Sequence, residues 1–314
     1  MPAVRTAARY VFSISVFTLI LYLLDASDVL ATIAGADIVS VVIAVGFALA
    51  AQFSSAVRLR RLLLMQGITL SLRKVFSIGL SAVFFGLVIP GGTLAAFATR
   101  FVKLARNARV ELVGAALVVD RVIATAFLVI LGSMAIALDR AEPTWISVIV
   151  VCAITGAAII ALGRRAPSWI TGRLGDAAGN ESLGRLHRFG ARIGRAFLNY
   201  SSASGRQVLI ILATSLLSHL CGYAAYYVIA IAIGLDISFL SICWIRSGLI
   251  LSTMIPVSVA GLGAREITAI ALLIPLGFSE AQAVGFSMLI FLVTAVIIGL
   301  IGGFFELLGA IGRR

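Results

Sequence analysis

The stretch IPVSVAGLGARE, residues 255–266, interrupts an apolar segment of membrane-spanning length. A similar break, IPGG at residues 89–92, lies in the first half of the chain. Proline and glycine break helices, and irregular backbone at bilayer depth persists only where protein or a water-filled cavity covers it. Broken helices at corresponding places in two halves are typical of a transporter's substrate site. The two breaks therefore predict a membrane protein that moves a substrate.

Composition places the chain among integral membrane proteins. Hydrophobic residues make up 61% of its 314 residues and charged residues only 12%, against roughly 25% charged residues in a soluble domain. The net charge of +12 suits basic loops that face anionic lipid. We therefore expect an anionic phospholipid partner at the cytoplasmic face and no nucleic acid. The three cysteines lie in apolar runs and predict no disulfide framework.

The loop charges predict the topology. Acidic residues collect between the first two spans, after the fourth and after the sixth, whereas basic residues crowd three other segments, 58–74, 100–109 and 163–206. We assign Arg58, Arg60 and Arg61 to a cytoplasmic loop after the second span. The positive-inside rule then places both termini in the cytoplasm of a bacterial-type inner membrane.

The N-terminal apolar stretch, Tyr10–Leu24, resembles the start of a signal peptide because Arg5 and Arg9 precede it. A second apolar stretch follows at once, so we interpret it as a retained first span. The expected architecture is all-α: a single transmembrane domain, 1–314, with about six full spans. We leave open whether the chain forms a homo-oligomer.

Two segments are too short or too broken for ordinary crossings. Residues 75–99 start and end on the cytoplasmic side, and these 25 residues of the segment 75–109 are too few for two crossings of about 20 residues each. We predict a re-entrant hairpin there and a second one, from the opposite face, at 239–276. The second segment also fits two short full crossings. Two opposed hairpins are typical of an inverted repeat, and Ser81 and Ser247 each lie nine residues before the hairpin's proline.

The turns of the two hairpins have their own candidate residues. These are Pro90, Gly91, Gly92, Pro256, Ser258, Gly261 and Gly263. The basic segment at 163–206 contains eight arginines. Four of these arginines lie between Ser182 and Tyr200 and share one side of a helical wheel, opposite the apolar residues. This pattern predicts an amphipathic helix in the headgroup plane.

Several charges lie inside apolar sequence, where each costs about 2.5–3.5 kcal/mol if it faces lipid. They are Asp120, Arg121, Arg246, Arg265 and Glu266. We predict that they face one another or a wet cavity, and their surplus positive charge suits a phosphate headgroup. With Arg100 they form the candidate substrate site.

A structural role remains open for three of these charges. Asp120 and Arg121 are adjacent and point about 100° apart on a helix, so each can pin a neighbouring helix instead. Arg246 can extend outward to the interface. The stripe of Ser215, His219, Gly222 and Tyr226 favours helix packing over substrate contact.

The sequence contains no pattern typical of catalysis or of cofactor binding. No Walker-type Gly-Lys-Ser/Thr follows Gly91-Gly92, and no nucleophile elbow, carboxylate pair or metal-ligand cluster is present. We therefore expect no enzyme activity, no cofactor and no metal.

At these same residues the chain resembles the lysylphosphatidylglycerol synthase transmembrane (flippase-like) family, the membrane half of the multiple peptide resistance factor. The resemblance rests on residues 255–266, on Leu276-Gly277-Phe278-Ser279-Glu280-Ala281, on Gly302-Gly303, and on Pro90-Gly91-Gly92 through Arg100 with Asp120-Arg121. Leu94-Ala95-Ala96-Phe97 departs from the family's second Gly-Gly and acidic residue.

The resemblance implies lipid translocation between leaflets. We expect no lipid aminoacylation, because no soluble transferase domain follows. The function expected is a flippase for a lipid with a polar or phosphate headgroup. The alternatives are a small-solute or ion-coupled secondary transporter, and a non-transporting membrane partner of an envelope-lipid enzyme.

Overall fold

The structure is a computed structural model, and it describes residues 26–89, 92–106, 108–140, 192, 194, 196–197, 199–254 and 263–311. Apart from short turns and loops these residues are helical, as predicted. Four helical segments are long and apolar enough to cross a membrane: Ile38–Met65, Val110–Arg140, Gly205–Ala232 and Glu280–Leu308. The protein is thus an all-helical, polytopic membrane protein. The predicted first span and the predicted fifth span, between residues 142 and 163, fall outside the described residues.

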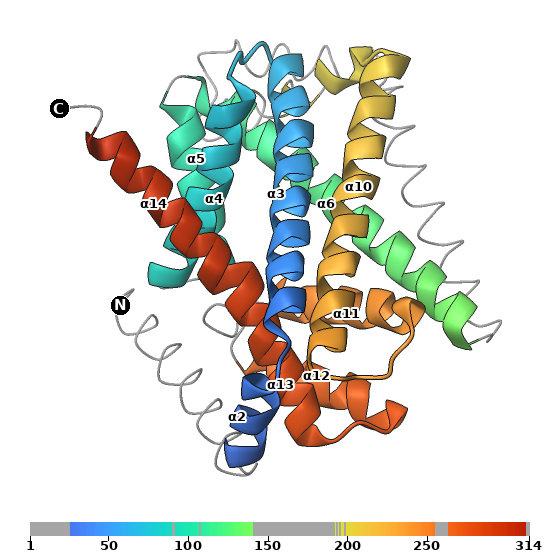
Figure 1. Cartoon of the computed structure of the whole chain (residues 1–314). Helices are drawn as coiled ribbons and strands as arrows, with labels where there is room; N and C mark the ends of the chain where they lie inside the picture. The colour runs from blue at the N-terminus through green and yellow to red at the C-terminus, as the bar shows by residue number, and fades with distance from the viewer. Residues whose placement is uncertain are drawn as a thin grey trace, which may run out of the picture.

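The described helices are shown in Figure 1. They are α2 (Ala26–Ala34), α3 (Ile38–Met65), α4 (Leu72–Val88), α5 (Thr93–Ala105), α6 (Val110–Arg140), α10 (Gly205–Ala232), α11 (Phe239–Met254), α12 (Ala264–Leu273), α13 (Glu280–Phe291) and α14 (Ile298–Ile311). A π-helical stretch, Leu292–Ile297, joins α13 to α14. Short 3-10 helices lie at Asn199–Ser202 and Ile274–Leu276.

Helices α3 and α10 run antiparallel, side by side, through the centre of the molecule (Figure 1). Asp37 caps the start of α3 by accepting the backbone N–H of Val39 and Ser40, at 3.3 and 2.9 Å. At that end the two helices are joined by a hydrogen bond from the Asp37 backbone N–H to the Ala232 carbonyl, 2.9 Å long. Near the middle, Ser218 donates to the Ala51 carbonyl at 3.0 Å. This pair forms one wall of the site described below.

Helices α4 and α5 form an antiparallel pair (Figure 1). The start of α4 and the end of α5 both lie near the end of α3. Gly92 precedes α5 with a φ of +48°, a backbone conformation that favours glycine. Gly86 lets the two helices approach, because a Cβ there would lie 3.1 Å from the Ala96 Cβ. Of the predicted turn residues on this hairpin, Pro90 and Gly91 lie outside the described residues.

Helices α11 and α12 form the corresponding pair in the second half of the chain and lie beside the end of α10 (Figure 1). Gly263 precedes α12 with a φ of +86°. The predicted turn residues Pro256, Ser258 and Gly261 lie outside the described residues.

The two helix pairs pack reciprocally on the long helices. The first arm of the first pair, α4, packs on α14, and the first arm of the second pair, α11, packs on α6. A glycine makes each contact close. A Cβ at Gly302 would overlap the backbone of Leu80 and Ser81, and a Cβ at Gly132 would lie 2.5 Å from the Ser247 side chain. Ser81 and Ser247 are the two serines that stand at equal distances before the prolines.

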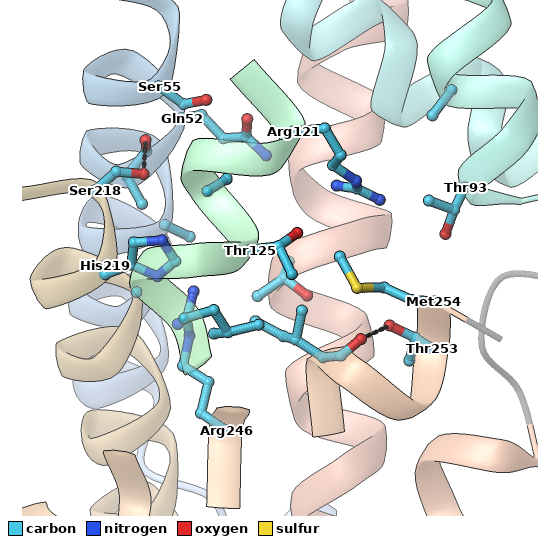
Figure 2. Close-up of a pocket in the computed structure, with 18 of the residues that line it drawn as sticks. Gln52, Ser55, Thr93, Arg121, Thr125, Ser218, His219, Arg246, Thr253 and Met254 are labelled. Atoms are coloured by element: carbon cyan, nitrogen blue, oxygen red, sulfur yellow. Dashed lines mark hydrogen bonds between the residues drawn. The ribbon is translucent and has the colours of Figure 1, made fainter. Parts of the chain in front are cut away.

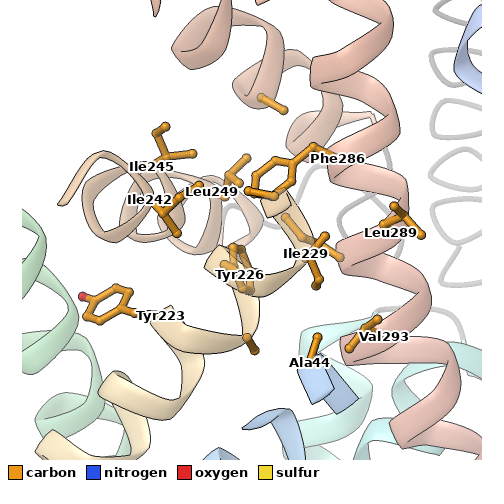
Figure 3. Packing of buried hydrophobic residues seen from close by; sticks show 14 of the residues in the cluster. Ala44, Tyr223, Tyr226, Ile229, Ile242, Ile245, Leu249, Phe286, Leu289 and Val293 are labelled. Carbon is orange, nitrogen blue, oxygen red and sulfur yellow. The ribbon is translucent and has the colours of Figure 1, made fainter. Parts of the chain in front are cut away.

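Two apolar clusters hold the helices together. The larger gathers α10, α11 and α13 around Tyr226, Ile242, Ile245, Leu249 and Phe286 (Figure 3). The smaller lies where α3 ends. It includes Leu62, Leu63, Leu104 and Val113. Within a bilayer such clusters hold helices together through close van der Waals packing, because lipid tails are as apolar as the side chains themselves.

The loop predicted after the second span is wrong at Arg58, Arg60 and Arg61, because α3 continues to Met65. Leu59, Leu62 and Leu63 are buried on the same stretch and keep it helical. Arg60 instead donates to the Leu70 carbonyl at 2.8 Å. Charge alone therefore misplaced the end of this helix.

Of the predicted basic segment, the structure describes only residues 192, 194, 196–197 and 199–206. Tyr200 donates to the Leu62 carbonyl at 3.3 Å, and Gln66 donates to the Ala196 carbonyl at 2.7 Å. Burial raises the pKa of Tyr200 to about 12, so its hydroxyl keeps its proton at physiological pH. These contacts anchor the start of α10 to the end of α3.

Candidate functional site

A cavity of about 450 Å³ lies between α3, α5, α6, α10, α11 and the α13–α14 region (Figure 2). Six charged side chains line it. They are Arg58, Arg100, Asp120, Arg121, Arg246 and Arg265. The structure thus brings together five of the six predicted substrate-site residues, from elements far apart in the sequence. The sixth, Glu266, is completely buried behind Arg265.

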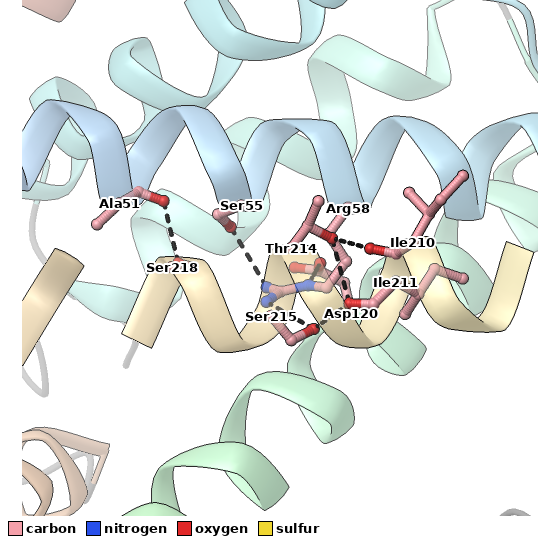
Figure 4. A network of polar contacts seen from close by, with 9 residues as sticks. All are labelled: Ala51, Ser55, Arg58, Asp120, Ile210, Ile211, Thr214, Ser215 and Ser218. Atoms are coloured by element: carbon pink, nitrogen blue, oxygen red, sulfur yellow. Dashed lines mark hydrogen bonds and ion pairs between the residues drawn. The ribbon is translucent and has the colours of Figure 1, made fainter. Parts of the chain in front are cut away.

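Asp120 forms a closed ion pair with Arg58 (Figure 4). The Arg58 Nε donates to Asp120 Oδ1 at 2.7 Å, and its other nitrogens donate to Ser215 at 3.5 Å and Ser55 at 3.3 Å. Arg58 is only 2% exposed. The pair joins α3 to α6, so the structural alternative for Asp120 is confirmed: it pins a neighbouring helix.

Arg121 follows Asp120 on α6 but points away from the ion pair and into the cavity (Figure 2). It is exposed, and within the described part of the chain it has no ionic partner. Arg100, on α5, is half-buried, and its Nε is buried without a hydrogen-bond partner among the described residues. Two guanidinium groups from different helices are therefore free to bind an anion.

Arg246 does not extend outward to the interface but lies in the cavity (Figure 2). Its guanidinium carbon is 4.8 Å from the ring centroid of Tyr223 and 5.3 Å from that of Tyr226. Each such cation–π contact stabilises the charge by about 0.5–2 kcal/mol. Gly222 provides the space, because a Cβ there would overlap the guanidinium.

Arg265 and Glu266 form a buried pair at the start of α12, in which Arg265 Nη2 lies 2.7 Å from Glu266 Oε1. Ser287 joins both side chains, since it accepts from Arg265 at 2.8 Å and donates to Glu266 at 3.0 Å. Glu266 also accepts the Gly263 backbone N–H at 2.7 Å, which caps the helix. Glu266 therefore fixes the position of Arg265, whose guanidinium faces both the cavity and the Phe291 ring.

The polar stripe on α10 divides between packing and the cavity. Ser215 supports Arg58, whereas His219, Gly222 and Tyr226 line the cavity. The His219 ring stacks on Phe127, with centroids 6.2 Å apart and planes 6° apart. The helical spacing of these residues was visible in the sequence, but it did not show which of them face the cavity.

Two polar clusters away from the cavity were missed by sequence reasoning. Lys103 on α5 pairs with Glu306 on α14, and Ser81 on α4 hydrogen-bonds to the same carboxylate. At the end of α6, Asp139 accepts from Ser241 at 2.7 Å and from the Trp244 indole at 2.9 Å. The sequence analysis assigned Lys103 and Asp139 to segments between spans, so it indicated no partner for either. Among the described residues, no group of three His, Cys, Asp or Glu side chains forms a metal site.

The Lysylphosphatidylglycerol synthase TM region family matches the chain over residues 7–302. No curated protein matches the chain. The family match covers both helix pairs, the cavity and nearly the whole sequence, and it agrees with the resemblance read from the proline and glycine breaks. The chain therefore belongs to the Lysylphosphatidylglycerol synthase TM region family.

Proposed function

We propose that the protein is a lipid translocase, and not an enzyme, that moves a lipid with a polar or phosphate headgroup between the leaflets of a bacterial inner membrane. The observation that carries the proposal is the cavity, because it gathers arginines from five helices between segments of membrane-spanning length. A headgroup needs such a polar enclosure to pass the hydrocarbon core.

The energetic cost of these charges favours a functional reason for them. Each arginine facing lipid at the bilayer centre costs about 2.5–3.5 kcal/mol, while a typical domain is stable by only about 5–15 kcal/mol. Arg58 and Arg265 have ionic partners, but Arg100, Arg121 and Arg246 have none within the described ranges. We infer that water and a passing anionic headgroup complete their surroundings.

The membrane topology follows as part of the same proposal. The α4–α5 and α11–α12 pairs are re-entrant hairpins that enter from opposite faces, and both termini are cytoplasmic. The reciprocal packing of α4 on α14 and of α11 on α6 supports an inverted repeat. The amphipathic helix predicted within 163–206 would contact anionic phospholipid at the cytoplasmic face.

The residues have distinct roles in this proposal. Arg100, Arg121, Arg246 and Arg265 contact the headgroup, because their side chains line the cavity. Glu266 and Asp120 act through the arginines that they hold. The sequence contains no ATPase motif, so transport is driven by a gradient or runs downhill.

A small-solute transporter is the second candidate, because about 450 Å³ is also the size of a small-molecule site. Uptake of a soluble anion by proteoliposomes would favour it over lipid exchange. A non-transporting partner requires its intramembrane charges to be closed in ion pairs. The unpaired Arg246 argues against that alternative.

The direct test is leaflet exchange of a fluorescent phospholipid in liposomes that contain the purified protein. We expect exchange in wild type and a fall of at least tenfold in Arg265→Ala and Glu266→Ala. Unchanged exchange in both variants would reject the assigned site. No exchange in wild type would reject the function.

A further inference from the structure

We propose that Arg246 forms a phosphate-binding subsite beside His219, and that the lipid moved carries a net negative headgroup. This inference rests on the proposed function and specifies its substrate class. It starts from a side chain that no element of the described structure neutralises. Arg246 is 9% exposed, and both its Nε and its Nη1 are buried without a hydrogen-bond partner among the described residues.

The protein holds this guanidinium in a defined position. Tyr223 and Tyr226 contact it with their rings, and Gly222 leaves the volume that it fills. The Tyr223 hydroxyl lies 3.1 Å from the Ser247 hydroxyl and fixes one of those rings. The aromatic rings support the charge, and the Tyr223 hydroxyl also hydrogen-bonds to the guanidinium. Two guanidinium nitrogens, Nε and Nη1, remain without an acceptor among the described residues and are available to a ligand.

His219 adds a third nitrogen to the same cavity. It is 7% exposed, it lines the cavity, and its Nδ1 is buried with no partner in the described part of the chain. The ring is held between Phe127 and Tyr223. Figure 2 shows His219 and Arg246 side by side at one end of the cavity, with Arg121 further along it. The other ring nitrogen, Nε2, donates to the Ala124 backbone carbonyl, which leaves Nδ1 as an acceptor, so His219 lines the subsite without donating to the oxyanion.

The balance of acidic and basic side chains around the cavity indicates the sign of the ligand's charge. Among the described residues, Asp120 is the only acidic side chain that lines the cavity, and Arg58 already neutralises it. Glu266 is neutralised in the same way by Arg265 and Ser287. The sequence at 90–91 and 255–262 contains no acidic residue either. Among the described residues that line the cavity, no carboxylate is left for a headgroup ammonium. Arg100, Arg121 and Arg246 have no ionic partner among those residues.

A phosphate oxyanion fits this arrangement. It has several oxygens that accept charge-assisted hydrogen bonds, so it can satisfy both unpartnered nitrogens of the guanidinium. A free phosphate ion has the same chemistry as a lipid phosphodiester, so the experiment must separate these two sources. A headgroup that also carries an ammonium, such as an aminoacylated one, would find repulsion instead of a partner.

The test uses the full chain in liposomes and in detergent. Leaflet exchange is measured with fluorescent phosphatidylglycerol and with its lysyl ester, and binding of inorganic phosphate is measured by calorimetry. We expect phosphatidylglycerol to exchange at least tenfold faster than the lysyl ester. Arg246→Gln should slow it by tenfold or more, the scale of one hydrogen bond to a charged group.

Matched variants separate loss of the subsite from loss of the fold. Arg140→Gln removes an arginine at the end of α6 that lies 5.6 Å from the Trp244 ring and outside the cavity, and should leave exchange unchanged. Arg246→Lys keeps the charge but not the paired N–H groups and should retain part of the activity. His219→Gln keeps a donor and should be milder than His219→Ala.

The outcomes are distinguishable. Equal exchange of both lipids, unaffected by Arg246→Gln, would overturn the subsite while leaving lipid translocation intact. Phosphate binding that Arg246→Gln abolishes, without any lipid exchange, would support the subsite with a free anion as its ligand and reject the proposed function. Neither phosphate binding nor lipid exchange in wild type would overturn both.

Discussion

Arg58 of α3 and Asp120 of α6 form a buried ion pair, 2.7 Å from Nε to Oδ1, at the edge of a cavity whose other arginines are less completely paired. The intramembrane charges fall into two groups. Arg58 and Arg265 form ion pairs with carboxylates, whereas Arg246 lines the cavity without an ionic partner among the described residues. The second group determines which ligands the cavity can bind.

Removing one partner of this pair should destabilise the fold strongly. Breaking a buried ion pair typically costs about 3–5 kcal/mol, because the remaining charge stays buried and uncompensated. We expect Asp120→Leu and Arg58→Met each to lower the free energy of unfolding in detergent by about that amount. The double variant should recover most of the loss. Additive losses in the double variant would show that the two side chains do not act as a pair.

Gly222 should be intolerant of any side chain. A Cβ at this position would overlap the Arg246 guanidinium, and overpacking of a buried site costs about 1–3 kcal/mol. We expect Gly222→Ala to reduce lipid exchange by displacing Arg246. Gly46→Ala is the matched control, since a Cβ at Gly46 meets nothing within 4 Å. Equal exchange in the two variants would contradict the placement of Arg246.

The two reciprocal helix contacts should respond alike to substitution. Gly302 lies against the backbone of Leu80 and Ser81, and Gly132 lies against Ser247. We expect Gly302→Ala and Gly132→Ala each to lower thermal stability, with the larger effect at Gly302, because backbone yields less than a side chain. Gly46→Ala again serves as the control. A stability loss in neither variant would refute the close packing.

The proposed re-entrant topology of the α4–α5 and α11–α12 pairs predicts a specific pattern of labelling from the two sides of the membrane. Single cysteines in place of the exposed Thr69 and Arg109 should react with an impermeant reagent from the cytoplasmic side. Cysteines in place of Asp236 and Glu280, also exposed, should react from the opposite side. Labelling of Thr69→Cys and Arg109→Cys from opposite sides would mean that α4 and α5 make a full crossing.

Much of this protein follows from its sequence. Long apolar runs indicated a helical membrane protein, and the breaks at Pro90 and Pro256 indicated helices that stop inside it. The segments Leu72–Ala105 and Phe239–Leu276 do contain paired helices. Single charges inside apolar sequence also identified four residues of the cavity, because a charge in such a place needs an enclosed partner or water.

The partners of those charges could not be predicted in the same way. Arg58 belonged, by charge, to a basic cluster, and only the fold shows that α3 carries it to Asp120. The link between Lys103 and Glu306 joins residues from opposite ends of the sequence, which local patterns do not connect. Glu266 was predicted to bind substrate, but its position behind Arg265 depends on Gly263 and Ser287.

Lipid translocation as proposed here requires a cavity that is both hydrated and cationic, and thiol labelling tests this requirement directly. In a variant with its native cysteines replaced by alanine, Thr125→Cys places one thiol on the cavity wall (Figure 2). We predict that a negatively charged methanethiosulfonate reacts with it faster than a positively charged one, relative to a free thiol, and that Arg246→Gln reduces this preference. A thiol that reacts with neither reagent, or that prefers the cation, would contradict the account.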